Sequence, residues 1–180
     1  MKLKACLSFL AVVAVGTLAG CSATTTKTAD VSSSIRASLD QGGFKDVSVT
    51  QDLDKGVVTL GGHVATFDAK TQAESITHSL AGNQVVANQI AVVPPGAESE
   101  AKNINADLDK GIESNLYAAL IQDRLHENVK YAVKNNVVTL TGEVDSQSKR
   151  ARAATVASAV PNVQQVVNEL QVKAQRATSN

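Results

Sequence analysis

The hydrophobic period changes in a fixed order along the chain. Between residues 31 and 39, apolar side chains recur at every fourth position, which predicts an amphipathic helix. Over 47–53 and again over 57–64 they alternate with polar side chains, which predicts two strands. A second helical period over 69–80 and a last alternating segment over 86–92 complete the order helix–strand–strand–helix–strand.

The same order returns about 80 residues later as an internal repeat. Residues 56–64 align with 136–144 without a gap, and the match continues to a closing pattern Val-x-Asn-x-Φ-x-Val, in which Φ is apolar. Asn88 and Asn168 are equivalent positions of that closing pattern. Each copy has about 65 residues, near the lower limit for an independent core, which favours two small domains over one large one.

Turn and cap residues support this prediction. Gly56 ends the hairpin turn of the first copy, where a positive φ is required, and the second copy has two asparagines there. Gly62 and Gly142 stand in phase with the apolar face of a strand, so we expect a helix to approach the strand closely at these positions. Thr66 and Ser146 are suited to cap the second helix of each copy.

The sequence therefore predicts an α+β protein of two tandem domains, at 30–93 and 108–174. In each, we expect a small mixed three-stranded sheet covered on one face by two helices. A polar stretch that begins with two prolines, over 94–107, is predicted to be a linker, and 175–180 form a C-terminal tail. The uncovered sheet face is expected to pack on the sister domain, which is the simpler interpretation, or to meet a partner.

Residues 1–20 have the order of a secretory signal peptide: two lysines, an apolar run too short to cross a bilayer, and small residues. The ending Leu-Ala-Gly-Cys resembles the bacterial lipobox, in which Cys21 would receive a diacylglycerol and become the first residue after cleavage. A plain signal peptide with an incidental cysteine is the alternative. Residues 21–29 are predicted to be a flexible tether, and Ser22 after the cysteine is similar to outer-membrane lipoproteins.

The repeated unit resembles the BON domain. The resemblance rests on the hairpin strand (G/N)-V-V-T-L-x-G-x-V, on the closing pattern with Asn88 and Asn168, and on the order of elements, and it covers both copies. It implies envelope maintenance, osmotic-stress tolerance and binding to phospholipid membranes, without catalytic chemistry. The copies also differ, since Gln51 of the first stands where the second has Tyr131.

Composition argues against several other classes of protein. A hydrophobic fraction of 43% argues against general disorder, and a net charge of +0 argues against a basic nucleic-acid binder. The three histidines and two cysteines do not stand at metal-ligand spacing, and the sequence offers no nucleophile paired with a base. We therefore expect no catalytic residue, no metal and no cofactor.

The distribution of charge points to the second copy. Its balance is positive whereas that of the first copy is negative, and Lys149, Arg150 and Arg152 gather near the start of a helix. Cations at that end oppose the helix dipole, so an anionic partner would offset their cost. These three residues are the candidate site for anionic phospholipid, and a solvated helix end is the alternative interpretation.

Taken together, the sequence predicts a non-enzymatic lipoprotein at the periplasmic face of the outer membrane. Its expected partners are the membrane, through the acyl anchor on Cys21 and anionic phospholipid, and an envelope protein, but no nucleic acid. The alternative is a protein-interaction or chaperone-like adaptor in the periplasm. The lipid, the protein partner and the oligomeric state are left open.

Overall fold

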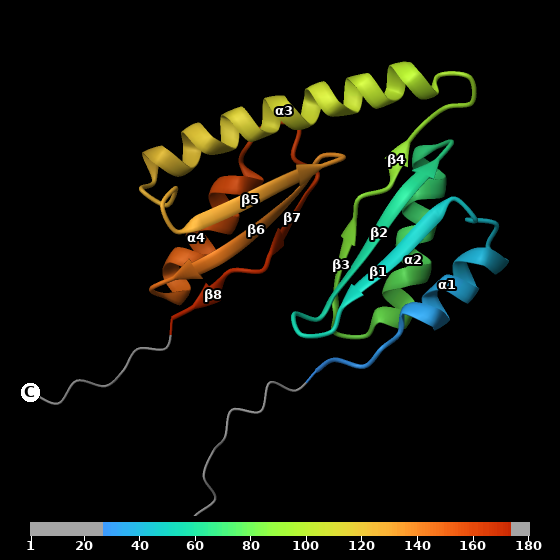
Figure 1. The fold of residues 1–180 in the computed structure, drawn as a ribbon, viewed down its shortest axis with the longest axis horizontal. Helices are drawn as coiled ribbons and strands as arrows, with labels where there is room; N and C mark the ends of the chain where they lie inside the picture. The colour runs from blue at the N-terminus through green and yellow to red at the C-terminus, as the bar shows by residue number, and fades with distance from the viewer. Residues whose placement is uncertain (1–26, 174–180) are drawn as a thin grey trace, which may run out of the picture.

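Two α+β domains of the same design lie side by side in the computed structural model, which describes residues 27–173 (Figure 1). The predicted fold class is confirmed, whereas residues 1–20, Cys21 and the tail at 175–180 lie outside the described residues. The first domain contains α1 (Ser32–Gln41), β1 (Val47–Asp52), β2 (Val57–Val64), α2 (Phe67–Ala81), β3 (Val85–Asn88) and β4 (Ala91–Val92). The second contains α3 (Glu98–Gln122), β5 (Val129–Lys134), β6 (Val137–Val144), α4 (Gln147–Ser158), β7 (Gln165–Asn168) and β8 (Gln171–Val172).

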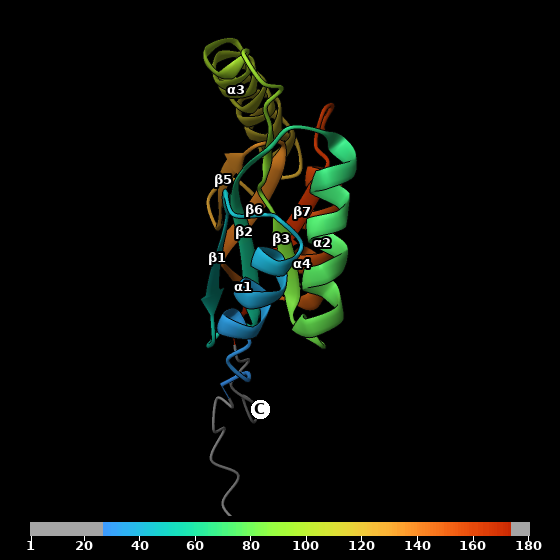
Figure 2. The same cartoon turned by 90° about the vertical axis from the view of Figure 1, so that its right-hand side faces the viewer.

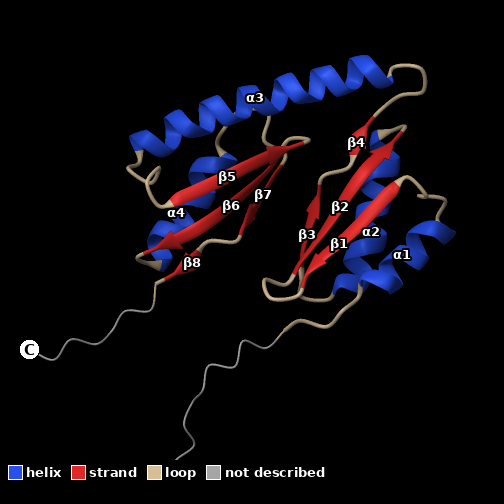
Figure 3. Cartoon of the chain, viewed as in Figure 1, coloured by secondary structure: helices blue, strands red, loops and turns tan. Residues whose placement is uncertain are grey.

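The second strand of each domain is the centre of its sheet (Figure 3). β2 pairs antiparallel with β1 and parallel with both β3 and β4. β6 pairs in the same way with β5, β7 and β8. The predicted third strand is thus a strand broken in two, with residues 89–90 and 169–170 at the breaks.

The helices of each domain cover one face of its sheet, as Figure 2 shows for α1 and α2. Alternation along β2 turns Val58, Leu60 and Val64 towards these helices, where all three are buried. The helix α1 contributes Ile35 and Leu39 at the predicted four-residue spacing. The core of the second domain repeats the arrangement with Ile112, Leu116, Leu120, Val138, Leu140 and Val144.

The asparagine of the closing pattern bridges the broken strand and the helix beside it. The Asn88 side-chain oxygen accepts from the backbone amide two residues on (3.3 Å), and its Nδ2 donates to the carbonyl of Lys70 in α2 (3.5 Å). Asn168 makes the equivalent bonds, at 3.2 Å and, to Arg150 of α4, 3.0 Å. The backbone groups freed by the break therefore keep partners, as buried polar groups must.

The two glycines in the middle strands have a different neighbour from the one that we expected. Gly62 and Gly142 have φ of +88° and +119°. A Cβ on Gly62 would overlap the carbonyl oxygen of Asp46, just before β1, and one on Gly142 would overlap that of Asn128. The close approach is therefore made by the backbone that enters the neighbouring strand and not by a helix.

The local turn and cap predictions are confirmed. Gly56 has φ of +66°, and Asn135 and Asn136 in the equivalent turn have +48° and +66°. The Thr66 side chain accepts from the amide three residues on in α2 (3.2 Å), and Ser146 does the same in α4 (3.2 Å). These local choices of residue agree with the tertiary fold.

The faces of the two sheets that carry no helix pack against each other. Val57 and Ala87 of the first domain form one buried cluster with Val137 and Val167 of the second. Val57 and Val137 are equivalent positions of the repeat, and so are Ala87 and Val167. Packing on the sister domain, the simpler of the two interpretations, is what the structure contains.

Polar contacts across the interface follow the same equivalence. Lys55 in the β1–β2 turn pairs with Glu169 at the β7–β8 break, with 2.6 Å between Nζ and Oε2. Asn135 in the β5–β6 turn donates from Nδ2 to the carbonyl of Gln89 at the β3–β4 break (2.7 Å). Each turn thus binds the break of the other domain, which is the reciprocity of a two-fold-related interface.

Gln165 departs from this symmetry. Its Oε1 accepts from the backbone amide of Asn88 (2.9 Å) and its Nε2 donates to the carbonyl of Val86 (2.6 Å). One side-chain amide therefore pairs two groups on the outer edge of β3, which would otherwise offer a site for strand addition. The equivalent Val85 has no polar atoms in its side chain and remains 47% exposed.

The connection between the domains is mostly helical. The predicted linker, 94–107, is irregular only up to Ala97, and α3 starts at Glu98, ten residues before the predicted second domain. Asp109 of α3 accepts from the amides of Asn135 (2.8 Å) and Asn136 (2.9 Å). The polar composition of 94–107 is compatible with a solvated helix as well as with a coil, so it did not predict the helix. The contact of Asp109 with the β5–β6 turn helps to hold the helix in place.

Replacement of Gly62 by alanine should destabilise the first domain by about 3 kcal/mol or more, because a positive φ and a backbone clash add. Gly43 is a matched control, since its φ is +86° and nothing lies within 4 Å of its Cβ position. We expect Gly43→Ala to cost only about 1 kcal/mol. Urea unfolding followed by circular dichroism measures both, and equal losses would contradict the assignment of the clash.

Candidate membrane-facing surface

The three basic residues predicted as a lipid site lie in the first two turns of α4. Arg150 points inward, because its Nε donates to the carbonyl of Leu170 (2.8 Å) and its Nη2 to that of Asn168 (3.1 Å). These two carbonyls flank the break between β7 and β8. Arg150 therefore satisfies the backbone of its own domain.

Lys149 and Arg152 are exposed but paired with acids. Lys149 Nζ lies 2.6 Å from Asp145, and this hydrogen bond holds the pKa of the Asp145 carboxyl below its usual value. Lys173 also pairs with Asp145, at 3.8 Å. Arg152 donates to Asp123 from Nε (2.8 Å) and from Nη2 (2.6 Å). The structure thus does not bring the three cations together as one unpartnered cluster.

Two lysines at the start of α4 have one carboxylate between them. Lys149 and Lys173 share the single carboxylate of Asp145, whereas Arg152 and Asp123 balance each other. Lys173 follows β8 directly, and the sequence analysis did not single it out. The sequence could not have pointed to Lys173, because the end of β8 is brought beside the start of α4 only by the tertiary fold.

The N-terminal segment is bound to the first domain by Gln51. Its Nε2 donates to the carbonyl of Ala29 (2.7 Å) and its Oε1 accepts from the amide of Val31 (3.0 Å). The amide of Thr28 also donates to the carbonyl of Leu53, just after β1 (3.0 Å). The chain therefore enters the first domain beside the β1–β2 turn, and the described part of the predicted tether, 21–29, is bound there through Thr28 and Ala29.

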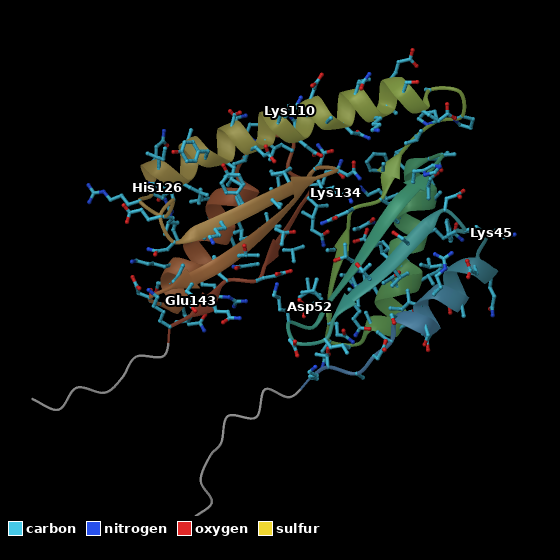
Figure 4. All side chains as sticks on the ribbon, in the orientation of Figure 1. Lys45, Asp52, Lys110, His126, Lys134 and Glu143 are labelled. Carbon is cyan, nitrogen blue, oxygen red and sulfur yellow. The ribbon has the colours of Figure 1, made fainter. Side chains whose placement is uncertain are left out.

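One end of the molecule carries both of these features. The segment before α1 and the start of α4 lie at the lower end in Figure 1, and Asp52 and Glu143 mark this end in Figure 4. We call it the tether end. α3 runs along the opposite side, where Lys110 is labelled.

Exposed apolar side chains are found elsewhere on the second domain. Tyr117 and Ile121, one turn apart on α3, are 52% and 42% exposed. Arg124 follows just after the end of α3, with φ of +55°, and the described residues hold no acidic partner for it within ion-pair distance. Sequence reasoning missed this pair because it followed the buried stripe of the helix, although the spacing of four residues was readable.

A groove of about 410 Å³ runs between α3 and α4 in the same domain. Its lining is Asn115, Ala119, Asp123, Arg152, Thr155, Val156, Ala159, Val160 and Pro161. The Arg152–Asp123 pair is the charged part of this lining, and the remainder is small or apolar. The groove is therefore a shallow surface feature and holds no nucleophile beside a base.

Two kinds of site are absent from residues 27–173. No helix in this range is both long and apolar enough to span a bilayer. In the same range, no three His, Cys, Asp or Glu side chains lie together in an arrangement that could hold a metal ion.

Comparison with known proteins finds the BON domain twice, at residues 27–94 and 108–174. The chain is 29% identical over 146 residues to osmotically-inducible protein Y of Escherichia coli strain K12, which covers 79% of this chain and 71% of that protein. Among solved structures, CdsD, a structural protein of the type III secretion system of Chlamydia trachomatis, is 15% identical with a TM-score of 0.36, over 77% of this chain and 90% of that chain. A C-terminal domain of CdsD is also 15% identical, with a TM-score of 0.34, over 80% of this chain and 98% of that chain. TM-scores this low carry no conclusion.

Replacement of Arg150 by methionine should destabilise the second domain by about 2 kcal/mol, because two backbone carbonyls lose charged donors. Arg152→Met is the matched control, since it removes an exposed ion pair that contributes less than about 1 kcal/mol. Urea unfolding compares the two variants. A larger loss from Arg152→Met would contradict the structural role of Arg150.

Proposed function

Because the chain belongs to the BON-domain family, we propose that it is a non-enzymatic envelope protein whose second domain binds anionic phospholipid. In this proposal Cys21 carries the lipid anchor, the protein faces the periplasm from the outer membrane, and its role is outer-membrane integrity or tolerance of osmotic stress. The similarity to a relative named for osmotic induction supports the second part of that role.

The observation that carries the lipid proposal is that the tether and the two lysines beside Asp145 lie on the same side of the molecule. Six residues lie between Cys21 and Thr28, and the seven steps from one to the other span at most about 25 Å. An acyl group on Cys21 would therefore hold the tether end close to the bilayer. Lys149 and Lys173, which share one carboxylate, belong to that end.

The strength of such a contact is modest for each residue. A basic side chain close to an anionic membrane contributes about 1 kcal/mol, and the contribution falls with ionic strength. Two lysines therefore give at most about 2 kcal/mol, too little to hold a soluble protein on a membrane. The anchor would supply stable attachment, and the lysines would orient the second domain on the surface.

A second candidate function, a protein-interaction adaptor in the periplasm, is favoured by the exposed side chains at the C-terminal end of α3 and just after it. Tyr117, Ile121 and Arg124 combine an aromatic, an aliphatic and a cationic side chain, a composition enriched in protein interfaces. They lie outside the tether end, so a partner there would not compete with the membrane.

A vesicle sedimentation assay tests lipid binding with the unacylated Cys21→Ser chain. At low ionic strength, where the attraction is strongest, we expect weak binding to anionic vesicles and none to zwitterionic ones, and at least a tenfold loss of this weak binding in the double variant Lys149→Gln, Lys173→Gln. The control is Lys102→Gln, Lys110→Gln on α3, which changes the net charge equally and should bind like the unaltered chain. Equal binding to both kinds of vesicle, or equal losses in the two double variants, would refute lipid binding by the tether end.

Mass spectrometry of the N-terminus tests the anchor separately. We expect the mature chain to begin at Cys21 and to carry the added mass of acyl chains, and to sediment with outer membranes in cell fractions. Cys21→Ser should move the protein into the soluble periplasmic fraction, since one or two lysine contacts do not replace two or three acyl chains. An unmodified cysteine in a soluble mature chain would refute the anchor.

A further inference from the structure

Lys70 in α2 is a buried cation that the proposed function does not use. Only 8% of the residue is exposed. The one hydrogen bond that its side chain makes within residues 27–173 joins Nζ to Oε1 of Gln164 in the other domain, at 3.4 Å. No carboxylate among the described residues lies within ion-pair distance of it, although Glu74 is one turn further along the same helix.

The repeat shows how unusual this arrangement is. The residue equivalent to Lys70 is Arg150, whose Nε and Nη2 donate to two carbonyls of its own domain at the break between strands. Lys70 makes neither of the equivalent contacts and instead turns its ammonium group towards the sister domain. The first domain therefore closes its strand break without this cation and leaves a positive charge at the domain junction.

A pocket of about 400 Å³ surrounds Lys70 at that junction. Its volume lies within the range of small-molecule sites. Besides Lys70, it is lined by Phe67, Thr71, Glu74, Asn88, Val137, Gln164 and Gln165.

The lining is divided into a polar and an apolar part. Gln164 offers a side-chain NH₂ group next to the ammonium, because its oxygen is the atom that faces Lys70. Phe67 is 60% exposed although it is a large aromatic side chain, and Val137 belongs to the opposite domain. The oxygens of Glu74 face Asn88, at 3.0 Å, and His78, at 3.7 Å.

Electrostatics favours an anion in this place. Burial lowers the pKa of Lys70, and the nearby charge of Glu74 only partly opposes that effect. A buried ammonium without a carboxylate partner is costly, because its hydration is lost and little replaces it. An anionic group within hydrogen-bond distance of Nζ would offset the cost of the lost hydration.

From the geometry, we infer that the pocket between the two domains binds a small organic carboxylate. Its carboxylate accepts from Lys70 Nζ and from the amide of Gln164, and its apolar body lies between Phe67 and Val137. The ligand contacts both domains, so its binding also holds the two sheets together. This site is independent of the lipid surface at the start of α4.

The experiment compares benzoate with its neutral isostere benzamide, by chemical-shift titration of the purified Cys21→Ser chain. We expect saturable millimolar binding of benzoate, with shifts confined to the pocket lining at 67–74, 88, 137 and 164–165, and at least tenfold weaker binding of benzamide. Equal binding of the two compounds, or benzoate shifts spread over exposed lysines, would overturn the inference.

Two substitutions of Lys70 make the test specific. Lys70→Met keeps most of the apolar stem and should weaken benzoate binding at least tenfold. Lys70→Arg keeps the charge, yet it should also weaken binding at least tenfold, because a guanidinium can reach the strand-break carbonyls as Arg150 does. Lys110→Met, on the outer side of α3, is the control and should bind benzoate normally.

An unchanged affinity in either Lys70 variant would overturn the inference. If Lys70→Met does not fold, Lys70→Gln takes its place, and the spectrum without ligand shows whether each variant keeps the fold.

Discussion

Each domain of this protein has one sheet and only two helices, so one face of the sheet has no helix to cover it. In the first domain that face is polar and exposed at Ser48 and Thr50 of β1, but it also carries the apolar side chains of Val57 and Ala87, which are costly to leave in water. The two domains bury these positions together, since Val57 and Ala87 form one cluster with Val137 and Val167. The reciprocal contacts of Lys55 with Glu169 and of Asn135 with Gln89 then set the register of the faces. The pocket at Lys70 exists because of this packing, as three of its eight lining residues come from the second domain.

Comparison of the two copies distinguishes residues that maintain the fold from residues that make a contact in one copy only. Asn88 and Asn168 bridge the same break in the same way, and Gly62 and Gly142 meet the same backbone, so these positions serve the fold. The copies differ at positions where one of them contacts the N-terminal segment or the sister domain. Gln51 binds the N-terminal segment, whereas the equivalent Tyr131 packs against the core of the second domain. Gln165 pairs the edge of β3, whereas Val85 cannot. Lys70 and Arg150 differ for the same reason: one faces the sister domain and the other its own backbone.

The two proposed binding surfaces follow from different physical conditions. At the tether end the cations are exposed and paired, so each contributes little and the effect depends on the nearness of an anionic surface. At the domain junction a single cation is buried with only one amide contact, and one anion would matter more there. The first surface would act through a lipid anchor, whereas the second depends only on how the two domains pack.

The sequence alone determined the domain architecture, because period, turn residues and caps are local properties that are repeated with an offset of 80. It therefore predicted the order of elements, the turns at Gly56 and Asn135 and the caps at Thr66 and Ser146. Only the tertiary structure decided which groups share a contact across long separations. The acids beside Lys149 and Arg152, the inward turn of Arg150, the backbone at Gly62 and the burial of Lys70 all depend on how distant segments pack. A cluster of basic residues in a sequence shows where positive charge lies, but it does not show which carboxylate or carbonyl each side chain contacts. Those contacts are set by packing.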